Sequence, residues 1–298
     1  MVTTVRPRLP PEFTNLPSSN GHLNTPESRV GDIVLYNLDC AKGMTKLSSS
    51  SIDCIVTSPP YNLGISYNEY DDTLPRDRYI SWLISVFKGL KTKLKLDGSL
   101  FLNIGSAPSS PWGPFEVISA LRPYFVLQNS IHWIKSIYVE NDSYGERKSL
   151  NVGHYKPING NRFLNDTHEY IFHLTKTGRV PLDRLSIGVP YKDKGNIERW
   201  RNGSAGLRCR GNTWYVPYKT INSRERERPH PASFPIEIAE MCIKLHGIRL
   251  NPTTVLDPFM GIGNTALACR KLGVGCIGFE IDKSYYETSV KLLKQSLI

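Results

Sequence analysis

Apolar residues along the chain follow two periods, one typical of buried strands and one typical of amphipathic helices. Strand-like runs of apolar and β-branched residues occur at 31–36, 51–57, 99–104, 126–134, 168–174, 254–257 and 275–280. Between them, apolar residues recur every three or four positions in the stretches 76–95, 114–121, 235–246, 264–272 and 283–297. Strands that alternate with helices predict an α/β fold with a doubly wound, mostly parallel sheet.

Two segments lack this alternation of strands and helices, and they suggest the domain organisation. Residues 1–30 carry five prolines and no apolar periodicity, which predicts a disordered N-terminal arm. Residues 138–228 are rich in Gly, Asn, Arg and Lys, and a stretch this long without strong periodicity is usually functional or mobile. Residues 31–137 and 229–298 are therefore expected to form one domain. The strand near 168–174 is expected to return from the insertion to its sheet.

Composition excludes several classes of protein. No apolar run approaches the ~18 residues that span a bilayer, and the N-terminus lacks a signal-peptide core, so a soluble cytoplasmic protein is expected. The six cysteines include no CxxC pair, which argues against a zinc site and favours buried thiols. We therefore expect no metal.

Positive charge is concentrated in the insertion. The chain has a net charge of +10, and residues 143–228 hold 17 of its 37 Lys and Arg but only 8 of its 27 Asp and Glu. A basic face confined to one segment is typical of phosphate-backbone binding, although charge alone fits a solvated loop equally well. The candidate DNA contacts are Lys192, Lys194, Arg199, Arg201, Arg208 and Arg210. The aromatic residues Trp200, Trp214 and Tyr215 could stack on bases or fill a small core.

One candidate site follows the expected strand at 254–257. The sequence from Asp257 to Asn264 contains Gly261 and Gly263 and leads into a helix, so its backbone can approach a ligand closely. The next strand ends in Glu280, which can accept hydrogen bonds from both hydroxyls of a ribose. Together these features predict a nucleoside-containing cofactor.

A dinucleotide cofactor is the rival interpretation of this loop. The loop lacks the third glycine of GxGxxG, and Asp257 would repel a pyrophosphate but could pair with the amino group of a methionine moiety. The pattern therefore favours S-adenosylmethionine over NAD.

A second candidate site is the tetrad Ser58-Pro59-Pro60-Tyr61, at the end of the strand near 51–57. Two prolines fix the backbone and remove two N–H groups, so the Ser58 side chain and the Pro59 carbonyl can act as acceptors. Tyr61 can stack on a planar ring. A rigid turn with a core-facing tyrosine is the alternative.

The two sites together resemble the β-class DNA amino-methyltransferases. Ser58 to Tyr61 is similar to their (D/N/S)PPY motif, and Asp257 to Gly263 is similar to their FxGxG motif. The order along the chain, with the tetrad first, the basic segment next and the glycine loop last, also matches this permuted class. The resemblance covers about residues 31–298 and implies the methyltransferase fold with an inserted target-recognition region at 138–228.

The resemblance also implies roles for individual residues. It assigns the tetrad, chiefly Ser58, Pro59 and Tyr61, to the target base. It assigns the cofactor to Asp39, His230, Asp257, Phe259, Gly261, Gly263, Asn264 and Glu280. Asp39 is expected near the adenine ring, although a helix-capping acid fits its sequence context equally well. His230 belongs to a segment that lines the methionine site in this family; taken alone, it would more often be structural.

The chemistry expected of this family is a direct methyl transfer to an exocyclic amino group of a flipped-out base. No Pro-Cys nucleophile is present, which argues against transfer to carbon 5. Ser58 at the first position of the tetrad favours cytosine N4 over adenine N6. His168 and Glu169 lie on one expected strand and should face opposite sides, so they are not expected to form a dyad.

The expected partner is duplex DNA, with a cognate restriction endonuclease, if there is one, acting separately. A nucleotide-cofactor oxidoreductase and a catalytically inactive DNA-binding protein are the alternatives. The sequence leaves the oligomeric state and the recognition sequence open.

Overall fold

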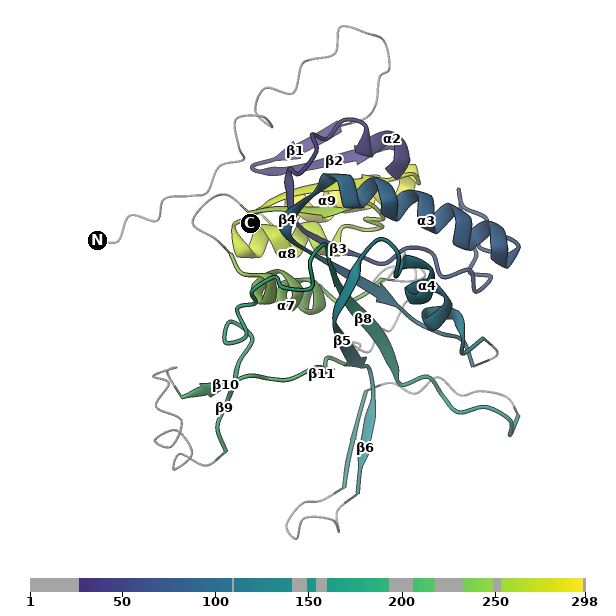
Figure 1. The fold of residues 1–298 in the computed structure, drawn as a ribbon, viewed down its shortest axis with the longest axis vertical. Coiled ribbons are helices and arrows are strands. Elements are labelled where there is room, and N and C mark those ends of the chain that lie inside the picture. Colours follow the sequence, from purple (N-terminus) through teal and green to yellow (C-terminus); the bar gives the residue numbers. More distant parts are fainter. Residues whose placement is uncertain are drawn as a thin grey trace, which may run out of the picture.

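The computed structural model describes residues 27–108, 110–140, 149–153, 160–192, 206–217, 233–248 and 253–296. Its centre is a nine-stranded sheet in the order β1-β2-β13-β12-β3-β4-β8-β5-β11 (Figure 1). The strands of this sheet are β1 (Glu27–Val30), β2 (Ile33–Asn37), β3 (Ile52–Thr57), β4 (Leu94–Ile104), β5 (Val126–Ile134), β8 (His168–Thr175), β11 (Thr213–Tyr215), β12 (Thr254–Asp257) and β13 (Gly275–Glu280).

Most neighbouring strands in this sheet run parallel. Strands β2, β13, β12, β3 and β4 pair in parallel, β11 pairs in parallel with β5, and β1 and β8 are antiparallel to their neighbours. The predicted α/β fold with a doubly wound, mostly parallel sheet is therefore confirmed. Every residue of β3, β12 and β13 is buried, as expected for strands covered on both faces.

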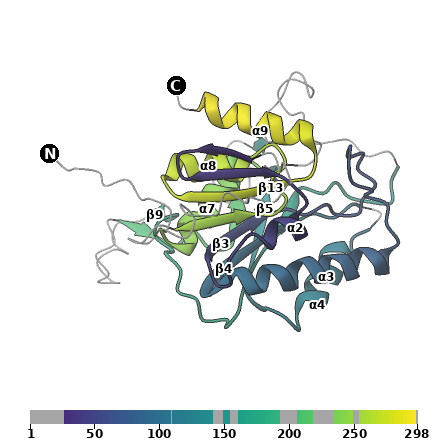
Figure 2. The same cartoon turned by 90° about the horizontal axis from the view of Figure 1, so that it is seen from above.

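Helices cover both faces of the sheet (Figure 2). One face is covered by α2 (Cys40–Met44), α3 (Arg76–Lys93) and α4 (Gly113–Leu121). The other face carries α7 (Ile236–His246), α8 (Asn264–Leu272) and α9 (Lys283–Gln295). Within the described residues, no helix is long and apolar enough to cross a membrane.

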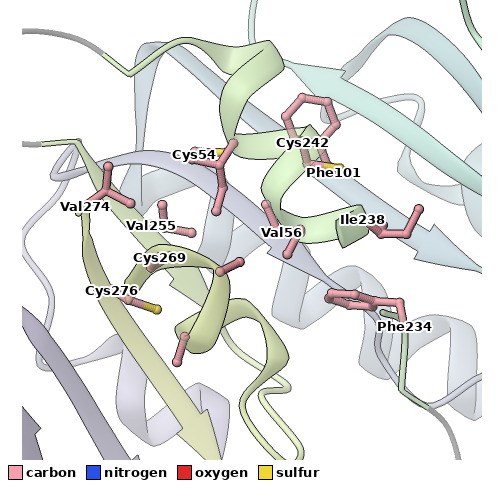
Figure 3. Packing of buried hydrophobic residues seen from close by; sticks show 14 of the residues in the cluster. Cys54, Val56, Phe101, Phe234, Ile238, Cys242, Val255, Cys269, Val274 and Cys276 are labelled. Carbon is pink, nitrogen blue, oxygen red and sulfur yellow. The ribbon is translucent and has the colours of Figure 1, made fainter. Parts of the chain in front are cut away.

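Each helical layer encloses its own hydrophobic core. The α3 face buries Tyr79, Leu83 and Phe87 completely against the sheet. On the opposite face, α7 and α8 pack Ile238, Cys242 and Cys269 among side chains of β3, β4, β12 and β13 (Figure 3). Cys54, Cys242, Cys269 and Cys276 are all buried free thiols in this second core. These two cores hold the sheet rigid, so the ends of its strands are fixed in space.

The structure differs from the sequence-based expectation in several short elements. Residues 27–30, expected within the disordered arm, form β1, because an antiparallel ladder to β2 satisfies their backbone groups. Residues 1–26 lie outside the described part. Helix α2 was not expected, because five residues show too little periodicity.

The inserted region also contributes to the main sheet. Strand β8 lies between β4 and β5, where the sequence analysis expects a strand, and β11 extends the sheet beyond β5. Two small ribbons lie outside it, formed by β6 (Ile137–Val139) with β7 (Leu150–Val152) and by β9 (Val189–Pro190) with β10 (Leu207–Arg208). The β6 ribbon extends away from the body of the molecule (Figure 1).

Strands β3 and β12 are neighbours although about 200 residues separate them in sequence. The chain runs from β12 to β13 on one side of this pair and from β3 to β4 on the other. In doubly wound sheets, ligands bind outside the carboxyl ends of the strands at such a point of reversal. The fold therefore brings the ends of β3, β12 and β13 to one edge.

Candidate active site

Asp257, at the end of β12, joins the two predicted sites. Its carboxylate accepts hydrogen bonds from Thr57 Oγ1 at 2.9 Å, from Thr265 Oγ1 at 2.6 Å and from the Phe259 N–H at 3.1 Å. Burial raises its pKa to about 6, and these hydrogen bonds oppose the shift. Asp257 therefore ties the tetrad strand to the glycine loop and to the first turn of α8.

The turn that carries the tetrad is held rigidly from outside. The hydroxyl of buried Tyr79 donates to the Pro60 carbonyl at 2.8 Å. The carboxylate of Asp72, only 2% exposed, accepts from the N–H groups of Asn62, Leu63 and Ile65 at 2.8–3.0 Å. Asn62 adopts a left-handed backbone with φ of 58°, which its short polar side chain tolerates. The tetrad is thus preorganised before any ligand binds.

Within the tetrad, Ser58 contacts Tyr61. Their hydroxyl oxygens lie 2.6 Å apart, and the Tyr61 hydroxyl also donates to Glu169 at 3.2 Å. Pro59 is buried, and its carbonyl accepts no hydrogen bond from any described residue. Both acceptors expected from the sequence therefore remain able to receive a donor from a ligand.

Glu280 is positioned at the end of β13 by two backbone groups. Its carboxylate accepts from the Gly261 N–H at 2.7 Å and from the Asp282 N–H at 2.8 Å. Burial raises its pKa to about 7, which means that part of its population is protonated at neutral pH. A carboxylate has about four acceptor positions, so two remain for a ligand.

Two adjoining hollows lie at this edge of the sheet. The larger of the two, called the larger hollow, opens beside Glu280. Aromatic and acidic side chains dominate its walls. They include Asp39, Ser58, Tyr67, Tyr70, Trp82, Phe259, Glu280 and Asp282. Trp82 and Phe259 pack with ring centroids 5.7 Å apart. The Tyr70 hydroxyl is buried and has no hydrogen-bond partner among the described residues. This combination suits an aromatic ligand with polar edges.

Asp39 is a helix-capping acid, which was one interpretation of its sequence context, and its place near an adenine ring stays a prediction. It caps α2, where its Oδ1 accepts from the N–H groups of Ala41 and Lys42 at 3.0 and 3.2 Å. It also lines the larger hollow. Both capping bonds end on the same oxygen, so the other oxygen can accept a donor from a ligand.

A smaller hollow adjoins the larger one, and Ser58 and Phe259 line both. Its walls are formed by the glycine loop and the segment before α7, and they include Phe234, Asp257, Gly261, Asn264 and Thr265. Asn264 donates to the Phe234 carbonyl at 2.7 Å, which fixes this segment against α8. Gly263 has a φ of 87°, and an added Cβ would lie 2.9 Å from the Ser289 Cβ. Glycine is therefore required at this turn.

The predicted DNA contacts are only partly described. Lys192 and Arg208 are exposed, whereas Arg210 is partly buried and donates from Nε to the Ile187 carbonyl at 2.9 Å. Arg210 therefore also has a structural role. Lys194, Arg199 and Arg201 lie outside the described residues, as do His230 and Trp200.

Trp214 fills a core, which was one of the two possibilities left open for it. Its side chain is completely buried beside Trp133, and its Nε1 donates to the Gly211 carbonyl at 3.1 Å. Tyr215, the next residue, is 37% exposed. Trp214 is therefore unavailable to stack on a base.

Sequence reasoning missed most of the polar residues behind the tetrad. His168 and Glu169 do not contact each other as a dyad, but Glu169 bonds to Tyr61, and the ring of His168 packs edge-on to that of Tyr170. Asn103 and Lys135 complete the set around Glu169. Asn103 lies near the end of β4, Lys135 directly follows β5 and Glu169 lies near the start of β8, and only the pairing of these strands brings the three together.

The fold and the site define an α/β protein in which a serine-proline turn and a glycine loop adjoin at one edge of a doubly wound sheet. The family model N6_N4_Mtase, a DNA methylase family, matches residues 52–291. The chain therefore belongs to the N6/N4 DNA methylase family. With the tetrad ahead of the glycine loop, it has the β-class order, and the predicted family is confirmed.

Individual proteins support this assignment. The type II methyltransferase M.ScaI of Streptomyces caespitosus is 28% identical over 292 residues, covering 94% of this chain and 88% of that protein. The structure of PvuII DNA methyltransferase, a cytosine-N4-specific enzyme, aligns with a TM-score of 0.62 and 20% identity, covering 87% and 86% of the two chains. A putative DNA modification methylase of Thermus thermophilus, solved with S-adenosyl-L-methionine, aligns with a TM-score of 0.54 and 20% identity over 86% and 91%. The two structures share the fold of this chain.

Proposed function

We propose that this DNA methylase transfers a methyl group from S-adenosylmethionine to the N4 atom of cytosine in duplex DNA. The observation that carries the proposal is the position of Ser58, which lines both hollows. An acceptor at this junction can contact a base amino group and lie beside the reactive end of a cofactor.

The residues around the two hollows fit S-adenosylmethionine. Aromatic walls and the unpaired Tyr70 hydroxyl suit an adenosine, and the remaining acceptor positions of Glu280 suit its ribose hydroxyls. The smaller hollow, with Asp257 and the glycine loop, suits the methionine end. When bound, this cofactor supplies a methyl group on a positively charged sulfur.

The tetrad is proposed to hold the target base. Ser58 and the Pro59 carbonyl accept hydrogen bonds from the amino N–H groups, and the ring of Tyr61 stacks on the flipped base. These acceptors draw electron density toward the amino nitrogen and orient its lone pair. Catalysis then depends on positioning and preorganised electrostatics, since no covalent enzyme intermediate is required.

The inserted region is proposed to recognise DNA. Exposed Lys192 follows β9 and exposed Arg208 ends β10, so both belong to the same ribbon in the basic part of the chain. Phosphate contacts of this kind fix the register of a protein on the duplex but do not specify sequence. A cognate restriction endonuclease, where one exists, is proposed to act separately.

The choice of base rests on the first residue of the tetrad. Cytosine N4 and adenine N6 are both amino groups on electron-poor rings, and the family includes enzymes for each. Ser58 is a smaller acceptor than the Asp that usually accompanies adenine, and it leaves more room for a pyrimidine ring placed differently in the site.

The test is to incubate the enzyme with duplex DNA and labelled S-adenosylmethionine, digest the product and identify the methylated nucleoside by mass spectrometry. N4-methylcytosine is the expected product. N6-methyladenine without N4-methylcytosine would overturn the base assignment but leave the methyltransferase function intact. Transfer to no base, with intact cofactor and DNA binding, would favour an inactive DNA-binding protein.

A further inference from the structure

A largely buried polar cluster lies directly behind the tetrad. It consists of Glu169 on β8, Asn103 on β4, Lys135 just after β5, and the Tyr61 hydroxyl. We propose that Glu169, neutralised by Lys135, is a positioning residue that fixes Ser58 as a hydrogen-bond acceptor through Tyr61. This inference rests on the proposed function and extends it to residues that do not contact the substrate.

The orientation of Asn103 is set by the carboxylate. Its amide group lies 2.8 Å from Glu169 Oε2 and 2.7 Å from the Tyr61 oxygen. An ionised carboxylate can only accept, so Asn103 must present its NH₂ group to both atoms. Its own carbonyl oxygen is buried and has no partner among the described residues, so this orientation leaves one buried acceptor unpaired.

The single proton of the Tyr61 hydroxyl is then directed toward Glu169. The carboxylate lies 3.2 Å away, and because an ionised carboxylate can only accept, the Tyr61 hydroxyl must be the donor in this contact. The Tyr61 oxygen therefore acts as the acceptor in its 2.6 Å contact with Ser58. The Ser58 hydroxyl therefore donates its only proton to the Tyr61 oxygen.

This arrangement determines what Ser58 offers to a ligand. A serine hydroxyl can donate or accept, but with its proton committed to Tyr61, only its lone pairs face the hollows. These lone pairs can accept hydrogen bonds from the N–H groups of a base amino group. They cannot bond to a carbonyl oxygen of a base, which is itself only an acceptor. The cluster thus makes the serine a dedicated acceptor, as required for methylation at an amino nitrogen.

Lys135 balances the charge of this cluster. Its Nζ lies 3.1 Å from Glu169 Oε1, and the two side chains are only 18% and 11% exposed. A buried carboxylate without a partner would be costly, so the lysine allows Glu169 to remain a strong acceptor. The two carboxylate oxygens therefore divide their roles, with Oε1 facing the lysine and Oε2 facing Asn103 and Tyr61.

Gly105 allows this cluster to pack against the tetrad. A Cβ added at this position would lie 3.1 Å from Glu169 Cγ and 3.2 Å from Tyr61 Cε2. Most Cβ atoms have no contacts this short, so a side chain here would have to shift Glu169 or Tyr61 by a few tenths of an ångström. Gly105 therefore provides an independent way to disturb the cluster without removing a polar group.

The test compares the wild type with Glu169→Gln, Tyr61→Phe and the double variant. Loss of the charged acceptor should lower kcat by about 10- to 100-fold, less than the loss of about 100- to 1000-fold on removing a preorganised donor that contacts the reacting atoms directly. The KM for DNA and the Kd for S-adenosylmethionine should stay within about twofold of wild type, because neither ligand contacts Glu169. The double variant should lose no more kcat than Tyr61→Phe alone, since both changes break the same chain of hydrogen bonds.

Two further variants test the same cluster. Gly105→Ala should also lower kcat, and Glu169→Asp should have a higher kcat than Glu169→Gln because it keeps the carboxylate.

Glu240→Gln is the matched control. Glu240 is also a glutamate paired with a lysine, since its carboxylate lies 2.7 Å from Lys271 Nζ. Only 9% of its side chain is exposed. It lies on α7, away from the tetrad. Its kcat should equal that of the wild type. Any of three results would overturn the inference. They are a wild-type kcat in Glu169→Gln, additive losses in the double variant, and a loss of activity explained wholly by weaker ligand binding. A wild-type enzyme that methylates no DNA would instead contradict the proposed function.

Discussion

At the scale of single residues, two acids at neighbouring strand ends have different roles. Asp257 uses both carboxylate oxygens to tie β3, β12 and α8 together. Glu280 is anchored by two backbone N–H groups and still lines the larger hollow. Burial raises the pKa of both, to about 6 and about 7 respectively. Asp257 is thus chiefly structural in its described contacts, whereas Glu280 is the better candidate for a ligand contact.

Glu280→Gln should weaken S-adenosylmethionine binding by about 1.5–3 kcal/mol, the range for hydrogen bonds to charged groups. Only ionised Glu280 can accept from both ribose hydroxyls, and its pKa is about 7. The Kd of the wild type should therefore rise as the pH falls from 8 to 6, and this dependence should be much weaker in the variant. Isothermal titration calorimetry at several pH values measures both effects.

Glu287→Gln provides the control, since this acid on α9 has a side chain that is 62% exposed. It should bind the cofactor as the wild type does. An unchanged Kd in Glu280→Gln would remove Glu280 from the cofactor site.

At the scale of elements, the carboxyl ends of parallel strands gather the chemistry at one edge. The tetrad follows β3, the glycine loop follows β12, and Glu280 ends β13. The antiparallel β8 contributes the residue at its start, Glu169, to the same edge, because its direction is reversed. The described basic residues Lys192, Arg208 and Arg210 line neither hollow, so the basic part of the insertion is expected to act independently of the cofactor site.

Neutralising Lys192, Lys194, Arg199, Arg201, Arg208 and Arg210 should weaken DNA binding and flatten its salt dependence. Each lost phosphate contact should reduce the slope of log K against log salt by roughly one unit. Fluorescence anisotropy with a duplex at several salt concentrations measures this slope. Cofactor affinity should not change, because the described members of this set, Lys192, Arg208 and Arg210, line neither hollow.

Replacing exposed Lys291 and Lys294 on α9 removes charge from a different surface and should leave the slope nearly unchanged. Arg210→Gln is best examined separately, because its bond to the Ile187 carbonyl gives it a structural role. If the full set of changes preserved both affinity and slope, the segment would be only a charged surface.

At the scale of the whole molecule, one buried polar network crosses several elements. His173 on β8 bonds to Ser99 on β4 at 3.0 Å, and Ser99 bonds to His246 on α7 at 3.0 Å. Asn129 on β5 lies 3.0 Å from the other ring nitrogen of His173, whose ring stacks on Phe101. Burial, together with the nearby His246, lowers the pKa of His173 to about 3.

This shift predicts a pH-dependent contribution to stability. Above pH 6.5, His173 is neutral in both the folded and the unfolded chain, so its ionisation contributes nothing. Below pH 6.5, only the unfolded chain takes up the proton, so the folded state loses about 1.4 kcal/mol per pH unit until the pH approaches 3. His173→Gln removes this penalty.

The measurement is denaturant unfolding of both proteins between pH 7.5 and 4.5. His173→Gln should be the less stable protein at pH 7.5, because it loses packing and hydrogen bonds. The difference should shrink as the pH falls below 6.5. Comparing the two proteins cancels the opposite effects of Asp257 and Glu280, whose raised pKa values favour the folded state as the pH falls. A constant difference would show that His173 is protonated in the folded chain.

The sequence by itself determined the class of fold and most of its regular elements. Helix α8, strand β13 and strand β5 have the bounds that the sequence pattern predicts, because their apolar residues mark each element between polar or turn-forming residues. It also determined the tetrad and the glycine loop, because proline and glycine impose local backbone geometry wherever they occur. These signals are short-range and can be read without the fold.

Tertiary structure alone decided which distant residues meet. Asn103, Lys135 and Glu169 carry no local signal, and they converge on Tyr61 only because β8 pairs antiparallel to both β4 and β5. The same holds for Trp214, whose burial depends on a three-residue strand added at the sheet edge. Strand pairing between residues far apart is a long-range property. A one-residue change of register would turn these side chains to the opposite face.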